Sequence, residues 1–282
     1  MARHLERYGP QFEPRDIRVG KHVMDCYLGL PPPGMEINPN AVQLNTGIAS
    51  GPTVAMPFAA GLNHLGYATI IVSPHTPGTH NHEDTMRVSE KVMEGELGFD
   101  PTLLSYVPHS LGQRDTILGM IEFADDELLD HINNVIAVSP VGYRGVQGVV
   151  GAARTLTHDV FSLRYHRHLL RLGGDALKYT GNAGIRAPLI VREARGCDLI
   201  EPTKAIIARG IGVGAVLGRY DNMIHHNPSL EGLHEAGVTV TESVPTDHLG
   251  ILLQWEETLA AGLRVRDALD KERAERESKK SA

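Results

Sequence analysis

Residues 102–113 read TLLSYVPHSLGQ, and this stretch decides the fold. The apolar run that ends at Val107 is typical of a buried strand, and residues 115–129 (DTILGMIEFADDELL) after it have helical spacing. Ser110 lies between the two, where a sharp strand-to-helix turn would expose its hydroxyl. Such a turn is usually written G-x-S-x-G; here Gly112 keeps the second glycine and Pro108 replaces the first.

Short apolar runs and helix-like segments alternate along much of the chain. NAVQLNTG (40–47), YATIIVSP (67–74) and NNVIAVSP (133–140) each lead into a polar or helical segment. This alternation predicts βαβ units, hence an α/β fold with a mostly parallel sheet and helices on both faces. EPRDIRV (13–19) and HVMDCYLGL (22–30) are expected to supply edge strands before the parallel core.

The pattern changes between residues 145 and 208, where helix-like stretches are broken by glycines and no strand is clear. APLIVREA (187–194) fits a strand or a buried helical turn equally well. Because the segment is longer than an ordinary connection, it is interpreted as a helical cap, or lid, inserted into the sheet. The predicted domains are a core of residues 1–144 and 209–270, a cap of residues 145–208, and a charged tail of residues 271–282.

The composition is that of an ordinary globular protein and excludes several classes. The 282 residues carry a formal net charge of −7, which argues against a nucleic-acid surface. Cys26 and Cys197 lie far apart and match neither a disulfide framework nor a zinc spacing. The N-terminus has no apolar core of a signal peptide, and no segment is apolar enough to span a bilayer. A cytoplasmic protein with reduced thiols is expected.

Three reactive residue types stand at predicted strand ends, where open α/β sheets place their sites. They are Ser110, Asp221 in RYDNM, and His248 in PTDHLG. Their order, Ser…Asp…His, is that of a nucleophile, an orienting acid and a base. Asp247 is a rival acid, but adjacent side chains seldom face each other, so Asp221 is preferred. The simpler alternatives are a helix-capping role for Ser110 and a turn-capping role for Asp221.

With these residues in place, the chain resembles the α/β-hydrolase superfamily over roughly residues 38–263. PHSLG, AVLGRYDNMI and DHLGIL carry the resemblance. It implies a serine esterase-like or lipase-like member with a cap inserted after the sixth strand. Ser110 would be the nucleophile, His248 the base and Asp221 its orienting group.

The resemblance also implies an oxyanion hole formed by backbone N–H groups. One donor would be Leu111, directly after the nucleophile. The family's frequent H-G-x loop is here NTGI (45–48), without the histidine, and its expected donors are Ile48 first and Gly47 second. His109, Asn45 and Thr46 are expected to line the substrate pocket.

Fifteen histidines raise the question of a metal site. His75, His80 and His82 lie in one loop, and the pairs at 166/168 and 225/226 lie elsewhere. No helical i,i+4 pair and no CxxC accompanies them, so a polar loop at the pocket rim is favoured over a metal. No cofactor is expected either, because no G-x-G-x-x-G or G-x-x-x-x-G-K-[ST] follows the early strands.

The function predicted from the sequence is therefore hydrolysis of a small-molecule carboxylic ester. Hydrolysis of a thioester, an amide or a carbon–carbon bond would use the same apparatus. A non-catalytic ligand-binding protein of the same fold is the alternative from another class. Neither a nucleic-acid partner nor a membrane span is expected, and a homo-oligomer is left open.

Overall fold

A central sheet of eight strands organises the chain. The computed structural model describes residues 12–19, 22–47, 52–73, 82–95, 98–146, 151, 191–248 and 250–280. The strands are β1 Phe12–Val19, β2 His22–Gly29, β3 Asn40–Asn45, β4 Thr69–Ser73, β5 Leu103–Tyr106, β6 Ile132–Val138, β7 Gly212–Gly218 and β8 Val240–Val244.

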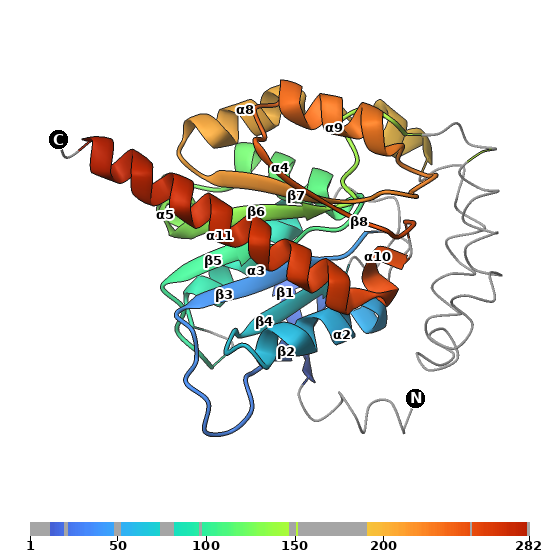
Figure 1. Cartoon of the computed structure of the whole chain (residues 1–282). Coiled ribbons are helices and arrows are strands. Elements are labelled where there is room, and N and C mark those ends of the chain that lie inside the picture. The colour runs from blue at the N-terminus through green and yellow to red at the C-terminus, as the bar shows by residue number, and fades with distance from the viewer. Residues whose placement is uncertain are drawn as a thin grey trace.

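The strands are ordered β1-β2-β4-β3-β5-β6-β7-β8 (Figure 1). β2 pairs antiparallel with β1 and β4, and every other neighbouring pair is parallel. β3, β6 and β7 are buried along their whole length, as expected for strands covered on both faces. The predicted mostly parallel α/β sheet is confirmed, and β1 and β2 lie together at one edge of it, where β2 runs against its neighbours.

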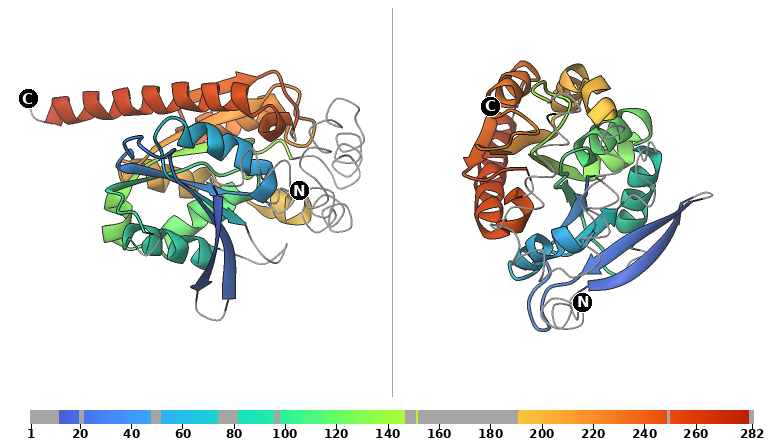
Figure 2. Two further views of the ribbon diagram at one scale, coloured as in Figure 1. Left: turned by 90° about the horizontal axis from the view of Figure 1, so that it is seen from below. Right: turned by 90° about the vertical axis from the view of Figure 1, so that its right-hand side faces the viewer.

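Helices cover both faces of the sheet. They are α2 Pro52–Asn63, α3 His82–Met93, α4 Gly112–Glu122, α5 Asp126–His131, α8 Ile200–Ala208, α9 His226–Glu235, α10 Gly250–Leu253 and α11 Trp255–Lys280. One core cluster joins α2, α10 and α11 to the sheet, and a second joins α3, α4, α5, α8 and α9 to its other face. Figure 2 shows these layers, with the β1–β2 hairpin extending away from the body.

The region predicted as a cap overlaps the core at its C-terminal end. Residues 191–196 are helical, which settles the end of APLIVREA as helix, and α8 follows. Thr203 and Ile206 of α8 are fully buried, and α8 packs against α4 and β7. α8 is thus the crossover helix that a parallel β6–β7 connection requires. α8 lies within the predicted cap of residues 145–208, and the bounds of that cap stay a prediction. Residues 147–150 and 152–190 lie outside the described part of the chain.

The predicted charged tail begins within a long helix. α11 continues to Lys280, and its last turns project past the sheet in Figure 1. Arg273 donates to the side chain and carbonyl of Asn133 on β6, and Thr239 donates to Glu272 at 3.2 Å. The first residues after the predicted boundary are therefore tied to the core. Within the described residues, no helix is long and apolar enough to cross a membrane.

Candidate active site

The turn after β5 has the backbone geometry of a nucleophile elbow. Ser110 has φ 53°, a left-handed conformation that is uncommon for a residue with a side chain. Its N–H donates to the carbonyl of Val138 at 3.1 Å, and the N–H of His109 donates to that of Asn45 at 2.9 Å. Ser110 is therefore held between the carboxyl ends of β3 and β6, in a strained conformation of the kind that clusters at functional sites.

Pro108 fits this turn because its missing N–H is not needed by β3. Val107 and His109 donate to the carbonyls of β3, the first of them to Gln43 at 2.8 Å. Alternate residues of a strand point their backbone groups to opposite sides, so Pro108 faces β6. There its carbonyl accepts from the N–H of Val138 at 2.8 Å. Replacement of the usual glycine thus leaves the elbow's bonds to β3 intact.

Two glycines let the loop after β3 approach the elbow closely. A Cβ on Gly112 would lie 2.2 Å from the carbonyl oxygen of Asn45. A Cβ on Gly47 would lie 2.9 Å from the Cβ of Ser110 and 3.4 Å from the backbone nitrogen of Leu111. Gly47 and Leu111, two of the expected oxyanion donors, are therefore neighbours. Ile48, the third, lies outside the described residues.

Asp221 and His248 form a buried pair at the ends of β7 and β8. Nδ1 of His248 lies 2.8 Å from Oδ2 of Asp221, and both residues are 4% exposed. The other oxygen of Asp221 accepts the N–H groups of Met223 and Ile224, both at 2.9 Å. Asp221 thus caps its own turn with one oxygen and contacts the imidazole with the other, and its role as the orienting acid stays a prediction.

Asp247 has a different contact. Its Oδ1 accepts the N–H of Gly250 at 2.7 Å, so it caps the start of α10. Asp221 is the carboxylate that meets Nδ1 of His248. The preference for Asp221 over its rival is consistent with this geometry.

His109 connects the elbow to His248. Its ring centroid lies 5.1 Å from that of His248, and the rings are tilted by 38°. Burial lowers the pKa of His109 well below its usual 6.5, and the neighbouring His248 lowers that pKa further. A neutral imidazole therefore lies between the strand that leads to Ser110 and the ring of His248. The sequence predicted a pocket-lining role and did not predict this contact.

The other two residues expected in the pocket have partners in the core. Asn45 donates to the hydroxyl of Thr116 at 2.7 Å and accepts from Gln43 at 3.0 Å. Thr46 donates from its hydroxyl to the carbonyl of Val72 at 3.3 Å. These contacts favour a structural role, because they fasten the loop after β3 to α4 and β4. Contact with substrate stays a prediction for both residues.

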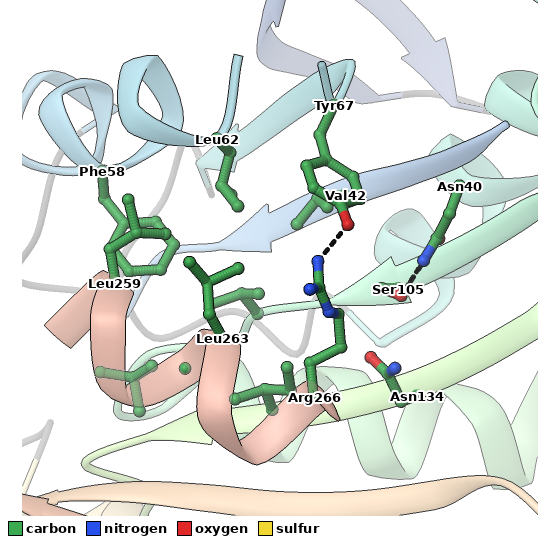
Figure 3. Close-up of a pocket in the computed structure, with 14 residues that line it drawn as sticks. Asn40, Val42, Phe58, Leu62, Tyr67, Ser105, Asn134, Leu259, Leu263 and Arg266 are labelled. Atoms are coloured by element: carbon green, nitrogen blue, oxygen red, sulfur yellow. Dashed lines mark hydrogen bonds between the residues drawn. The ribbon is translucent and has the colours of Figure 1, made fainter. Parts of the chain in front are cut away.

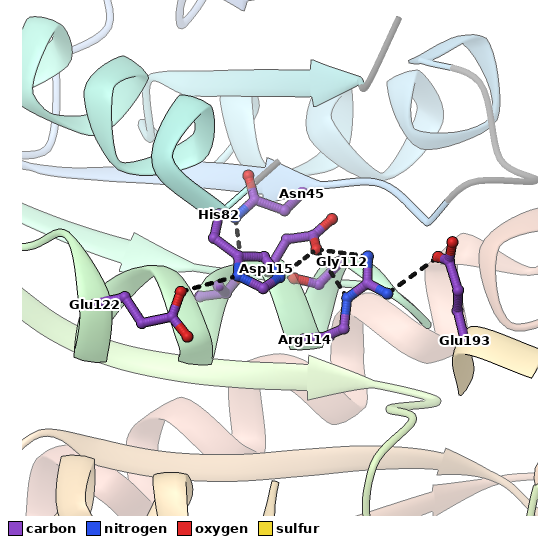
Figure 4. Close-up of polar contacts among 8 residues, drawn as sticks. Asn45, His82, Gly112, Arg114, Asp115, Glu122 and Glu193 are labelled. Atoms are coloured by element: carbon purple, nitrogen blue, oxygen red, sulfur yellow. Dashed lines mark hydrogen bonds and ion pairs between the residues drawn. The ribbon is translucent and has the colours of Figure 1, made fainter. Parts of the chain in front are cut away.

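A buried charged network flanks the elbow on α4 (Figure 4). Arg114 lies 3.0 Å from Asp115 and 3.1 Å from Glu193, which is in the helix formed by residues 191–196. His82, at the start of α3, lies 3.4 Å from Asp115 and 3.3 Å from Glu122. Burial alone would lower the pKa of His82, but its contacts with these two carboxylates raise it above 6.5.

His82 was therefore assigned to the wrong environment, since it is buried against α4 instead of lying in a polar rim loop. Its acidic partners are more than thirty residues away in the sequence, which hid this packing. His75 and His80 lie outside the described residues, as do those at 166 and 168.

Metal-ligand chemistry finds no support in the described ranges. No group of three or more His, Cys, Asp or Glu side chains there could hold a metal ion. His226 lies 2.7 Å from the hydroxyl of Ser243 and 3.0 Å from the side-chain oxygen of Asn227. Cys26 is buried and Cys197 half-buried, and both are thiols rather than halves of a disulfide.

A cavity of about 30 Å³ lies between the sheet and helices α2 and α11 (Figure 3). Its walls are mainly apolar and include Val42, Phe58, Leu62, Leu259 and Leu263. The guanidinium of Arg266 donates to the hydroxyl of Tyr67 at its edge. The cavity has room for about two water molecules, since one needs roughly 10–15 Å³.

Comparisons with known proteins agree with this geometry at the level of the fold. No family model matches the chain. A uridylate kinase from Pectobacterium atrosepticum is 36% identical over 105 residues, which are 37% of this chain and 36% of the kinase. The chain thus spans about a third of that relative's length, and no family follows from the match.

Solved structures match nearly the whole chain. E-2-(acetamidomethylene)succinate hydrolase has a TM-score of 0.62 at 16% identity, covering 91% of this chain and 99% of its own. The carboxylesterase CesB from Bacillus subtilis has a TM-score of 0.59 at 14% identity, covering 93% and 94%. An esterase from Pyrococcus furiosus has a TM-score of 0.59 at 13% identity, covering 95% of each. This chain has the α/β-hydrolase fold.

Within the α/β-hydrolase fold, the ends of β5, β7 and β8 carry Ser110, Asp221 and His248. The structure joins His248 to Asp221 directly and to the elbow through His109. The sequence analysis did not single out Arg114. The signal was that Arg114 and Asp115 stand in the first turn of a helix that must pack on the sheet, because a charge buried there needs an ionic partner.

Proposed function

We propose that this chain is a serine hydrolase that cleaves carboxylic esters through an acyl-enzyme on Ser110. The observation that supports it most is the 2.8 Å contact between His248 and Asp221 beside an elbow on which Ser110 has φ 53°. A serine hydroxyl is a poor nucleophile at neutral pH and requires such an oriented base.

The proposed reaction has two halves. His248 takes the proton from Ser110 as its oxygen attacks the ester carbonyl, and returns that proton to the leaving alcohol when the acyl-enzyme forms. Water then attacks the acyl-enzyme by the same proton transfers, releasing the carboxylic acid and restoring the serine. Asp221 holds the imidazole in the required tautomer and stabilises its charged form.

The oxyanion formed in each half would accept hydrogen bonds from backbone N–H groups. Leu111 is the N-cap residue of α4, so its N–H is at a helix N-terminus, and the proposed second donor is Ile48 or Gly47. Each such donor is worth roughly 3–4 kcal/mol of transition-state stabilisation. The 3.4 Å between the position of a Gly47 Cβ and the Leu111 nitrogen is consistent with two converging donors.

An ester is preferred over the other bonds by analogy with the carboxylesterase and the esterase of similar fold. Thioester, amide and carbon–carbon substrates use the same proton transfers. A non-catalytic role drew support from Pro108, but the elbow keeps its hydrogen bonds to β3 around that residue.

Hydrolysis of p-nitrophenyl esters of rising acyl length tests the proposal. Wild type should hydrolyse at least one of them, and Ser110→Ala should lose roughly 10⁴-fold or more of kcat. Ser105→Ala is the matched control, because this buried serine lies on the same strand and bonds to Asn40 at 3.0 Å, away from the elbow. Wild-type rates in Ser110→Ala would contradict the proposal. A folded wild type that hydrolyses no ester would contradict the ester assignment.

A further inference from the structure

The backbone of His109 is fixed on three sides. Its N–H donates to the carbonyl of Asn45 at 2.9 Å, and its own carbonyl accepts the N–H of Gly112 at 2.9 Å. It also forms a parallel bridge with Val138 of β6. Its side chain therefore projects from a rigid point between β3, β6 and α4.

From this point the ring reaches His248. The two rings lie 5.1 Å apart, and the ring of His109 also hydrogen-bonds to the backbone of His248. His109 is 5% exposed and His248 is 4% exposed, so both contacts exclude water. Because burial keeps His109 neutral, its ring can stay in contact when His248 takes up a proton.

His248 needs such a second restraint. It lies in the short connection between β8 and α10, outside any strand or helix. Asp221 holds Nδ1 of the ring at 2.8 Å, and a contact on another part of the residue would also fix the plane of the imidazole. A displacement of about 1 Å in a catalytic group can cost 10²-fold in rate.

We propose that His109 is a positioning residue, which clamps the backbone and ring of His248 against the nucleophile elbow. This inference rests on the proposed function and assigns His109 to the alignment of the base, instead of to the substrate pocket. His109 would act through His248 and would not touch the reacting atoms.

His109→Phe tests the clamp, because it keeps a ring of similar size and removes the hydrogen bond. With the p-nitrophenyl ester that wild type hydrolyses fastest, kcat should fall about 10- to 100-fold while KM stays within about twofold. His109→Asn and His109→Gln keep an amide donor, and at least one of them should recover most of the lost kcat.

His131→Phe is the matched control. His131 also bonds through its ring to a backbone carbonyl, that of Thr102 at 3.0 Å, but at the other end of the sheet. Its kcat should equal that of wild type. His109→Leu repeats the test with a smaller side chain, and thermal unfolding checks that each variant is folded.

The outcomes separate this inference from the function. An unchanged kcat in folded His109→Phe or His109→Leu overturns the clamp and leaves the serine mechanism standing. A rise in KM at constant kcat also overturns it, and would return His109 to the substrate pocket. If wild type hydrolyses none of the esters and Ser110 resists a fluorophosphonate, the proposed function fails, and with it the basis for the clamp.

Discussion

Replacement of Asp221 by Asn separates the two tasks of this carboxylate. One oxygen accepts two backbone N–H groups at 2.9 Å, and the other accepts Nδ1–H of His248 at 2.8 Å. An asparagine can keep its carbonyl oxygen towards the turn. Its NH₂ group then faces His248 and, being a donor, favours the imidazole tautomer that cannot take a proton from Ser110.

The magnitude follows from these contacts. Loss of the correct tautomer should lower kcat about 10⁴-fold, which is about 5.4 kcal/mol at 1.36 kcal/mol per factor of ten. The fold should suffer much less. Three charge-assisted hydrogen bonds become neutral or are lost, and we expect the free energy of unfolding to fall by roughly 1–3 kcal/mol.

The assay pairs ester hydrolysis with urea unfolding, and Asp247→Asn is the control. Asp247 caps α10, so its replacement should cost about 1 kcal/mol or less of stability and little activity. If Asp221→Asn retained activity within tenfold while Asp247→Asn lost a thousandfold, the acid would have been assigned to the wrong carboxylate.

Four further predictions concern stability. The pKa of His109 is lowered on folding. The free energy of unfolding of wild type should therefore fall by up to about 1.4 kcal/mol per pH unit as the pH drops below 6.5, and His109→Phe should remove this dependence. The pKa of His82 is raised, so its stabilising contribution is full below 6.5 and is lost as pH rises through its folded pKa; His82→Gln should therefore destabilise more at pH 5 than at pH 8 in urea titrations. Gly112→Ala should lower the free energy of unfolding by about 1–3 kcal/mol, because it forces a Cβ to within 2.2 Å of a carbonyl oxygen. Gly262→Ala on α11, where nothing lies within 4 Å of the new Cβ, should raise it by up to about 1 kcal/mol. Equal effects of the two substitutions would contradict the close approach at Gly112. Ser139→Gly should raise the free energy of unfolding by about 1 kcal/mol, because Ser139 has φ 41°, a conformation that glycine adopts without strain. A lower stability of the variant in thermal unfolding would argue against strain at this residue.

Much of the fold could be predicted because the sheet is buried on both faces. Such strands read as short continuous apolar runs, and a parallel sheet requires a helix between each pair. The strand ends then follow directly, which is why Asp221 and His248 could be paired across 27 positions of sequence. The sequence could not separate α8 from the predicted cap, because a helix that packs on the sheet and a cap helix have the same apolar period.

Contacts between distant side chains were beyond the sequence. The tilt of His109 against His248 depends on the register of β5 with β6, which no local pattern specifies. His82 reads as part of a polar loop until α3 packs beside α4 and brings Asp115 within 3.4 Å. Pro108 looked like a defect in the motif, and only the direction of its neighbours' N–H groups explains why it is tolerated.

The central claim is that Ser110 is an activated nucleophile, and covalent labelling tests it most directly. Wild type and Ser110→Ala are treated with a fluorophosphonate, and intact mass and peptide mapping locate the adduct. We expect one adduct per chain, on Ser110, and none in the variant. A folded wild type that stays unlabelled, or an adduct on another residue, would contradict the account.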